Sequence, residues 1–493
     1  MNRTLTRRHL VVGVAGVAAA ATLPRTAAAK RRRRRLKTDV CVVGAGLAGL
    51  VTARELVRSG RDFVVLEARN RVGGRVLNHR ISPGVVTELG AEFTGPTQDR
   101  IQALAAEMGV GLFPTYNEGN DVLIVEGRRS LYPAVPGISD DPDYIAALGA
   151  LGPLDQMAAE VPVLAPWKAP RAHEWDNQTL AQLRDQYVGT SGGRALFTVA
   201  SRAVWGRDPE ELSLLYCLFY IAAAGNPTTP GSFARLFTTA GGGQESRFVG
   251  GSQRVPIAVA RRLGDRVLLG APVRRIETTG SDRVTVTADA IEVAARRVVV
   301  AVPPVLAARI DFAPALPAAK RKLLRKLAPG TTLKLEVTYD RPWWRDLGLS
   351  GQGNSTTDPV NATFDNTPPQ GAPGILFGFV VGGAARALPA SAAGRQAALI
   401  DDLVALYGDE ARNVTGFVQG DWTRDPWTRG CPVGTLDRNQ LATLGPQLRR
   451  PVGLVHFAGT ETSTFWFGFM DGAVRSGERA AAEVVRSLRR GGR

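Results

Sequence analysis

Three glycines and one acid carry the clearest chemical signal in this sequence. Gly44, Gly46 and Gly49 form the pattern G-x-G-x-x-G, and Glu67 follows about 20 residues later. Gly44 would allow a tight turn, Gly46 would let a pyrophosphate approach the backbone, and Gly49 would let a helix pack closely on a strand. The carboxylate of Glu67 can accept hydrogen bonds from a ribose. Together these residues predict a dinucleotide site.

Two apolar strands and the helix between them are the elements that would position these residues. Residues 38–43 and 63–66 read as buried strands, and the segment after Gly49 has a helical pattern. The free backbone N–H groups at the start of that helix would bind the phosphates. Further strands are expected at 267–269, 273–276, 284–286, 298–302 and 455–459, and a last helix at 471–488. The cofactor domain is therefore expected to be assembled from separated segments.

The segments between these elements predict a second domain. Residues 114–240 are expected to be rich in helices, 331–339 to form a strand with one apolar and one polar side, and 351–373 to be irregular. The predicted fold class is α/β, with a Rossmann-type cofactor domain built from discontinuous segments and an inserted α+β substrate domain. The expected bounds are 38–112, 249–323 and 425–487 for the cofactor domain, and 113–248 and 324–424 for the substrate domain.

The net charge of +16 is concentrated near the N-terminus. Eleven of the 61 Lys and Arg residues precede Asp39, and none of the 45 acids does. Residues 6–10 resemble a twin-arginine export signal, and the apolar run at 10–23 is too short to span a bilayer. We therefore expect a signal peptide at 1–29 and a basic arm at 30–37. The mature protein is expected to be secreted or extracytoplasmic, without a membrane anchor.

The cysteines and histidines argue against two other kinds of site. Cys41, Cys217 and Cys431 are odd in number and far apart, which is not the pattern of a disulfide framework. Cys41 and Cys217 lie in apolar runs and are expected in the core. The four histidines form no cluster with metal-ligand spacing, so no metal site is expected.

An ordered series of motifs along nearly the whole chain resembles the flavin-dependent monoamine oxidases. Besides the glycine pattern, the series comprises 66–75, 95–98, 242–245, 248–251, 301–304, 457–462 and 468–473. The resemblance implies FAD as the cofactor of the Rossmann-type domain, and a small-molecule amine and O2 as reactants. It implies that the amine is oxidised to an imine, which is hydrolysed to a carbonyl product, with formation of H2O2.

The resemblance also implies roles for single residues. Lys334 matches the family lysine that holds a water near the flavin N5, and Gln244 matches a glutamine of the substrate cavity; with Phe469 they are the expected catalytic residues. The helix that begins near Met470 would direct its positive end to the flavin. Cys431 aligns with the cysteine that forms a thioether with the flavin in the animal enzymes, and non-covalent FAD is the alternative. The other residues expected at the cofactor are Gly44, Gly46, Leu47, Ala48, Gly49, Glu67, Ala68, Arg69, Gly74, Arg75, Gly90, Ala91, Val273, Trp422, Trp427, Gly459, Thr460 and Glu461.

The departures from the family pattern concern the substrate. Where the family usually has two facing tyrosines, this chain has Pro432 and Phe469. Phe469 keeps an aromatic face that can meet an amine, whereas Pro432 does not. Phe93, Phe237 and Trp466 are expected to complete the wall of the substrate pocket. The pocket is therefore expected to be apolar.

The leading expectation is a secreted FAD amine oxidase for a primary or secondary amine with an apolar or aromatic substituent. An L-amino-acid oxidase or a cyclic-amine oxidase on the same fold is the alternative. An amino acid would need a cation for its carboxylate, and Arg202 or Arg235 could serve. A third reading is a basic protein whose residues 31–35 contact nucleic acid or an anionic cell surface, although no specific nucleic acid partner is expected. A homodimer is a further expectation.

Overall fold

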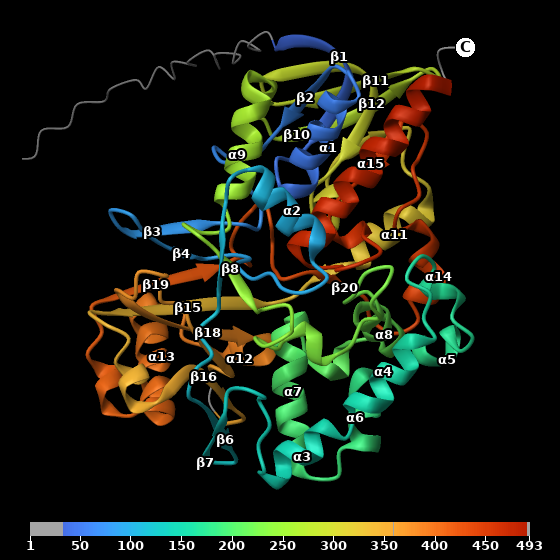
Figure 1. The fold of residues 1–493 in the computed structure, drawn as a ribbon. Coiled ribbons are helices and arrows are strands. Elements are labelled where there is room, and N and C mark those ends of the chain that lie inside the picture. The colour runs from blue at the N-terminus through green and yellow to red at the C-terminus, as the bar shows by residue number, and fades with distance from the viewer. Residues whose placement is uncertain (1–32, 358, 491–493) are drawn as a thin grey trace, which may run out of the picture.

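The computed structural model describes residues 33–357 and 359–490, which form two large sheets and a helical lobe (Figure 1). One sheet lies in the upper part of Figure 1, the other at the lower left, and the helical lobe at the lower right. This α/β arrangement confirms the predicted fold class. The expected signal peptide at 1–29 lies outside the described residues.

An eight-stranded sheet is the framework of the upper part. Its strands follow the order β13-β10-β11-β12-β1-β2-β9, and β21 also pairs with β12. Their bounds are β1 (Arg34–Val43), β2 (Phe63–Leu66), β9 (Val267–Leu268), β10 (Val273–Thr279), β11 (Arg283–Ala288), β12 (Ile291–Val300), β13 (Asp311–Ala313) and β21 (Val455–Phe457). β1 lies parallel to both β2 and β12, and Cys41 stands opposite Val64 and Val298. Both faces of the sheet are covered, so apolar residues suit these paired positions.

Helices from both ends of the described chain cover one face of this sheet. α1 (Leu47–Arg58) packs against α15 (Met470–Arg490) (Figure 1). A Cβ added at Gly477 would lie 2.5 Å from the carbonyl oxygen of Ala48, so glycine is what permits this close approach. The same face carries α2 (Asp99–Glu107) and α9 (Arg254–Leu263), and the opposite face carries α10 (Pro304–Ala307) and α11 (Ala318–Lys326).

A seven-stranded sheet with the order β19-β15-β18-β17-β16-β6-β7 forms the lower left part. Its strands are β6 (Asn120–Val125), β7 (Arg128–Pro133), β15 (Thr332–Tyr339), β16 (Leu349–Ser355), β17 (Ala362–Asp365), β18 (Gly374–Val381) and β19 (Gly416–Asp421). Helices α12 (Gly382–Ala387) and α13 (Ala392–Tyr407) lie beside it (Figure 1). Three short strand pairs are β3 (Asn78–Ser82) with β4 (Val85–Glu88), β5 (Leu112–Pro114) with β8 (Ser246–Phe248), and β14 (Ala328–Pro329) with β20 (Gly434–Thr435).

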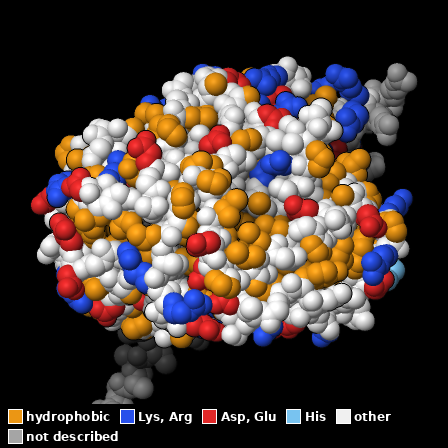
Figure 2. Space-filling model, turned by 60° about the horizontal axis from the view of Figure 1, so that its bottom comes forward, with side chains coloured by type: hydrophobic (Ala, Val, Ile, Leu, Met, Phe, Trp, Pro, Cys, Tyr) orange, Lys and Arg blue, Asp and Glu red, His pale blue; other side chains and the backbone are white. Residues whose placement is uncertain are grey.

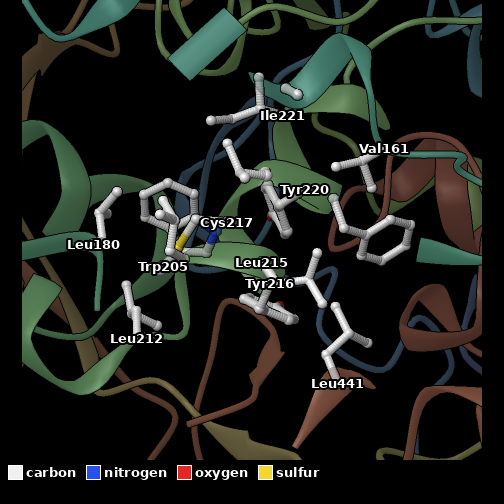
Figure 3. Packing of buried hydrophobic residues seen from close by; sticks show 14 of the residues in the cluster. Val161, Leu180, Trp205, Leu212, Leu215, Tyr216, Cys217, Tyr220, Ile221 and Leu441 are labelled. Carbon is white, nitrogen blue, oxygen red and sulfur yellow. The ribbon is translucent and has the colours of Figure 1, made fainter. Parts of the chain in front are cut away.

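The helical lobe has its own apolar core. Its helices are α3 (Pro142–Leu148), α4 (Leu151–Ala159), α5 (Ala172–Asp176), α6 (Leu180–Tyr187), α7 (Ser191–Trp205), α8 (Leu214–Ala222) and α14 (Leu441–Leu444). α8 is apolar on every side and lies at the centre of the lobe, capped by the Ser213 hydroxyl. Cys217 packs there beside Trp205, Leu215 and Tyr216 (Figure 3), which confirms that it is a core residue.

Two local predictions are wrong in part. Residues 351–373 were expected to be irregular, but β16 continues to Ser355 and β17 covers Ala362–Asp365, and both gain their hydrogen bonds from neighbouring strands. Residues 34–37 of the expected basic arm belong to β1, and their backbone pairs with β12 whatever their side chains. The segment 114–240 is rich in helices, as predicted, and also contains β6 and β7.

Apolar side chains form connected areas on the face shown in Figure 2, and charged side chains are scattered among and around them. The large apolar side chains exposed on β7, on α3 and in the segment between them are Leu131, Val135, Ile138 and Ile145. Acidic and basic residues are interspersed there, and they do not gather into one basic surface on this face. Within the described ranges, no helix is long and apolar enough to cross a membrane.

Candidate active site

Residues from both sheets and from the helical lobe line a cavity of about 490 Å³. Its walls come from the loop after β1, the ends of β2 and β12, the start of α15, strand β15 and the segment 422–432. β1, β2 and β12 are parallel, and their carboxyl ends meet at this cavity. Open α/β sheets bind their ligands at such an edge.

The glycine turn after β1 brings backbone to the cavity. Gly44 has φ +103°, and a Cβ added at Gly49 would lie 1.9 Å from the carbonyl oxygen of Gly44. The first turn of α1 therefore rests directly on this turn. Gly46, Leu47 and Ala48 line the cavity, and no side chain caps the start of α1. Its free N–H groups and positive end suit a phosphate group.

Glu67 is fixed at the end of β2 by two backbone hydrogen bonds. Its Oε2 accepts from the amide of Ala45 at 2.7 Å, and its Oε1 accepts from the amide of Arg69 at 2.9 Å. The residue is 4% exposed and lines the cavity. A carboxylate held in this way is suited to hydrogen-bond the hydroxyls of a ribose.

Most residues expected at the cofactor line this cavity. They are Gly44, Gly46, Leu47, Ala48, Glu67, Ala68, Arg69, Gly74, Arg75, Gly90, Ala91, Val273, Trp422, Trp427, Cys431, Gly459, Thr460 and Met470. Gly49 and Glu461 do not line it. Gly49 packs beneath the glycine turn, and Glu461 lies behind Arg75.

Arg75, which is partly buried, forms a bidentate pair with the buried Glu461. Nη1 and Nη2 of Arg75 donate to the two carboxylate oxygens of Glu461 at 2.6 and 2.9 Å, and Nη1 also donates to the carbonyl of Pro432 at 2.8 Å. Burial alone would raise the pKa of Glu461, but Arg75 holds this pKa below its ordinary value. The pair therefore joins the loop that carries Arg75 to the segment that carries Pro432.

Lys334 lines the cavity from β15, and several protein groups surround its ammonium. All eight residues of β15 are buried, so its polar side faces the protein and not solvent. The ammonium of Lys334 donates to the backbone carbonyl of Glu88 at 2.6 Å and to the carboxylate of Glu92, and lies 3.1 Å from Oε1 of Glu336. Burial would lower the pKa of Lys334, but these carboxylates raise it above its ordinary value. Lys334 is therefore an ammonium ion.

Cys431 and Phe469 line the same cavity from two other segments. Burial raises the pKa of the Cys431 thiol to about 12, against the effect of Arg75 and of a contact with the carbonyl of Thr332. The thiol is therefore protonated at neutral pH. The ring of Phe469 packs edge-on against Trp466, with 4.8 Å between the ring centroids.

Four of the expected pocket residues do not line the cavity, namely Gln244, Phe93, Phe237 and Trp466. Trp466 is 1% exposed and supports Phe469 from behind. Phe93 packs against rings on β17 and β18, and Phe237 against the core of the helical lobe. The three aromatic rings are therefore used in packing. Oε1 of Gln244 is buried and has no hydrogen-bond partner in the part of the chain that is described.

Several lining residues were not anticipated from the sequence. Among them are Leu306 and Arg309, which follow β12, Thr332 on β15, Ala203 on α7 and Phe379 on β18. The position just after a parallel strand is a signal that could have identified Leu306 and Arg309. Ala203 and Phe379 have no such local signal, because the packing of separate elements brings them to the cavity.

Comparison with known proteins gives a consistent result. Residues 47–485 match the family described as flavin containing amine oxidoreductase. AofH of Mycobacterium tuberculosis, named as a flavin-containing monoamine oxidase, is 40% identical over 455 residues, which cover 91% of this chain and 97% of that protein. Flavin-containing amine oxidase B of Sus scrofa is 34% identical over 461 residues, which cover 92% of this chain and 87% of that protein.

Solved structures are similar over the same length. Putrescine oxidase bound to putrescine aligns with a TM-score of 0.87 at 32% identity, covering 92% of this chain and 100% of that chain. Cyclohexylamine oxidase from Brevibacterium oxydans IH-35A aligns with a TM-score of 0.87 at 33% identity, covering 92% of this chain and 99% of that chain.

The cavity has the features that FAD requires. An uncapped helix start faces it beside the glycine turn, the Glu67 carboxylate is fixed at its edge, and it extends to Lys334, Cys431 and Phe469. These residues fit a dinucleotide whose reactive ring lies at the Lys334 end. The chain therefore belongs to the flavin-containing amine oxidoreductases and is a flavin-dependent amine oxidase.

Proposed function

We propose that this enzyme oxidises a primary or secondary amine with an apolar or aromatic substituent. The product would be an imine, which is hydrolysed to a carbonyl compound, while O2 is reduced to H2O2. The lining of the cavity near Lys334 carries this proposal: Phe379, Pro432 and Phe469 are apolar. Among the described residues that line the cavity, Glu67 is the only acid, and it belongs to the nucleotide end.

The chain's own residues would have distinct tasks in this reaction. FAD, held by the glycine turn and Glu67, would supply the two-electron oxidation. The ammonium of Lys334 would hold a water molecule by hydrogen bonding at the cavity wall. Phe469 and its neighbours would exclude bulk water and favour the neutral amine over its ammonium form, because a low dielectric disfavours charge. The positive end of α15, which starts at Met470, would stabilise negative charge on the flavin.

The charges around the cavity bear on the alternative substrates. A diamine would need an acid for its distal ammonium, and no lining acid near Lys334 is described. An amino acid would need a free cation for its carboxylate. Arg202 is paired with Asp208, Arg235 donates to two backbone carbonyls, and neither lines the cavity. A cyclic monoamine needs neither a second acid nor a free cation in the cavity. The similarity to a cyclohexylamine oxidase supports a cyclic amine as the second candidate substrate.

We also propose that FAD is attached covalently through Cys431. The thiol lines the cavity, and Arg75 draws its pKa downward against the effect of burial. One similar solved structure is a putrescine oxidase variant in which cofactor binding was redesigned with an introduced cysteine. Acid denaturation tests the attachment. The yellow chromophore should precipitate with the protein, and free flavin in the supernatant would exclude the thioether.

We propose two further properties, export from the cytoplasm and self-association. The arginine pair and apolar run near the N-terminus support export by the twin-arginine pathway. Enzyme activity in the culture medium, abolished when both arginines are replaced by lysine, would establish it. The exposed apolar side chains on β7 and α3 support a homodimer. Light scattering of the purified protein measures the assembly directly.

A peroxide assay across substrate classes tests the main proposal. The panel should contain aromatic and aliphatic monoamines, cyclic amines, diamines and L-amino acids at equal concentration. We expect the highest kcat/KM for monoamines with an apolar substituent. Activity confined to amino acids or to diamines would refute the proposed substrate class, and the flavin spectrum would show that the enzyme carries its cofactor.

A further inference from the structure

Five charged side chains meet in a buried cluster behind the cavity. Lys334 and Glu336 come from β15, Glu88 from the end of β4, Glu92 from the loop that follows, and Arg247 from β8. None of the five is more than 3% exposed. Of these side chains only Lys334 also lines the cavity, so it is the connection between the cavity and the cluster.

The cluster contains more acids than bases. Three carboxylates face two cations, and among the described residues the ion pairs within it are Lys334 with Glu92 and Glu336, and Arg247 with Glu88. A buried charge without compensation is costly, and a carboxyl group in this situation takes up a proton instead. The cluster is therefore balanced when one of its three carboxyl groups is protonated.

Glu92 is the carboxyl group best placed to take this proton. Oε2 of Glu336 accepts from a threonine hydroxyl on β4, and its Oε1 accepts no hydrogen bond but forms an ion pair with Lys334 at 3.1 Å. Glu88 is paired with Arg247. Oε2 of Glu92 accepts from Lys334, but its Oε1 is buried without a partner in the described part of the chain. Burial, with Glu88 and Glu336 as like charges, raises the pKa of Glu92 to about 7 against the attraction of Lys334 and Arg247.

The proposed reaction releases a proton before it consumes one. The balanced equation is R–CH2–NH3⁺ + O2 → R–CH=NH2⁺ + H2O2. The carbon loses a hydride and the nitrogen loses a proton, and both hydrogens end in H2O2. Bound FAD supplies the transfer of the two electrons to O2. The proton leaves the nitrogen before the hydride is transferred and is needed again only when O2 is reduced.

Building on the proposed function, we propose that Glu92 stores this proton between the two half-reactions. The ammonium of Lys334 gives a proton to the Glu92 carboxylate, and Lys334 takes up the proton that the substrate nitrogen releases into the cavity. The reverse transfer returns the proton when O2 is reduced. Glu92 does not line the cavity, so it is a positioning residue that acts through Lys334.

Infrared spectroscopy of the FAD-loaded enzyme without substrate tests the resting state of Glu92. A protonated carboxyl group has a C=O stretch that disappears on ionisation. We expect such a band to titrate near pH 7, to vanish in Glu92→Gln and to shift in frequency in Glu92→Asp. In Glu336→Gln the same band should titrate at lower pH, because this substitution removes a like charge that raises the pKa of Glu92. A band that persists in Glu92→Gln, or a midpoint that does not fall in Glu336→Gln, would overturn the assignment. If Glu92→Gln does not fold, a band that keeps its frequency in Glu92→Asp would likewise show that the protonated carboxyl group is not Glu92.

Anaerobic mixing with an amine in a weak buffer that contains a pH indicator tests the storage. At about pH 8 a carboxyl group with a pKa near 7 is ionised before the substrate arrives. Storage at this pH requires the pKa of Glu92 to rise when the flavin is reduced, as the added negative charge of reduced flavin would cause. The wild-type enzyme should then release less than one proton per flavin while the flavin bleaches, whereas Glu92→Gln should release about one. Equal release by both enzymes would refute proton storage. If no amine bleaches the flavin, the proposed function fails, and the infrared result still decides the protonation of Glu92.

Discussion

Replacing Glu461 by Gln should destabilise the enzyme because it leaves Arg75, whose side chain is only 22% exposed, as a cation without a countercharge. The two atoms that face Arg75 keep their positions in Gln, so the change removes charge and one acceptor and creates no cavity. Glu461 is 2% exposed, and the pair makes hydrogen bonds of 2.6 and 2.9 Å. Breaking a buried ion pair by removing one partner costs about 3–5 kcal/mol.

We place the expected loss for Glu461→Gln at the lower end of that range. The amide oxygen of Gln still accepts one bond from Arg75, so the free energy of unfolding should fall by about 3 kcal/mol. Because Arg75 holds the pKa of Glu461 below its ordinary value, this stabilisation is present above the unfolded-state pKa of about 4.5. It is lost as the pH falls through the lower pKa of the folded state.

Urea unfolding at neutral pH, followed by tryptophan fluorescence, measures this loss. The matched control is Glu174→Gln, which removes an ion pair with Arg171 on the protein surface, where both side chains are about half exposed. The control should leave the midpoint unchanged, since solvent screens exposed pairs. If Glu461→Gln unfolds at the same urea concentration as the control, the buried pair does not stabilise the site, and the reasoning is wrong. The loss should also shrink when the measurement is repeated in acid.

Three further substitutions test the site. Gly49→Ala would place a Cβ 1.9 Å from the carbonyl oxygen of Gly44, so the purified protein should contain little FAD, as measured by the ratio of flavin to protein absorbance; near-full occupancy would contradict the close-packing argument. Cys431→Ser should bind FAD that acid releases, and flavin that still precipitates with the protein would place the attachment elsewhere. Phe469→Ala should raise the KM for aromatic amines about tenfold, because burial of an aromatic contact contributes about 1–2 kcal/mol; an unchanged KM would remove Phe469 from the substrate wall.

The local signals of the sequence were sufficient for the nucleotide half of the site. Gly44 and Gly49 predict a turn because only glycine tolerates the positive φ at Gly44 and the close approach of Gly49 to the carbonyl oxygen of Gly44. The acid at 67 follows an apolar strand at the spacing that places it at the same sheet edge. Both features depend on residues that are close in the sequence, so the local sequence pattern is enough to predict them. The motifs further along the chain indicated the protein family, and the family implied that the cofactor is FAD.

The substrate half depends on contacts between distant segments. Phe93, Phe237 and Trp466 were expected in the pocket wall, yet they pack into cores or behind Phe469, because their burial is decided by elements far away in the sequence. The alternation in β15 predicted one apolar and one polar side, and only the tertiary structure shows that Lys334 on the polar side faces buried acids.

The sequence by itself therefore determined the cofactor domain, the glycine turn and the family. Each of these depends on the spacing of nearby residues and on residue types, such as glycine in a tight turn, that no other residue can replace. The tertiary structure alone decided the surroundings of Lys334. Glu92 and Lys334 are separated by 242 residues, and no local sequence pattern identifies Glu92 as the buried partner of Lys334. Burial and charge imbalance, which give that pair its properties, arise only when the loop after β4 is packed against β15.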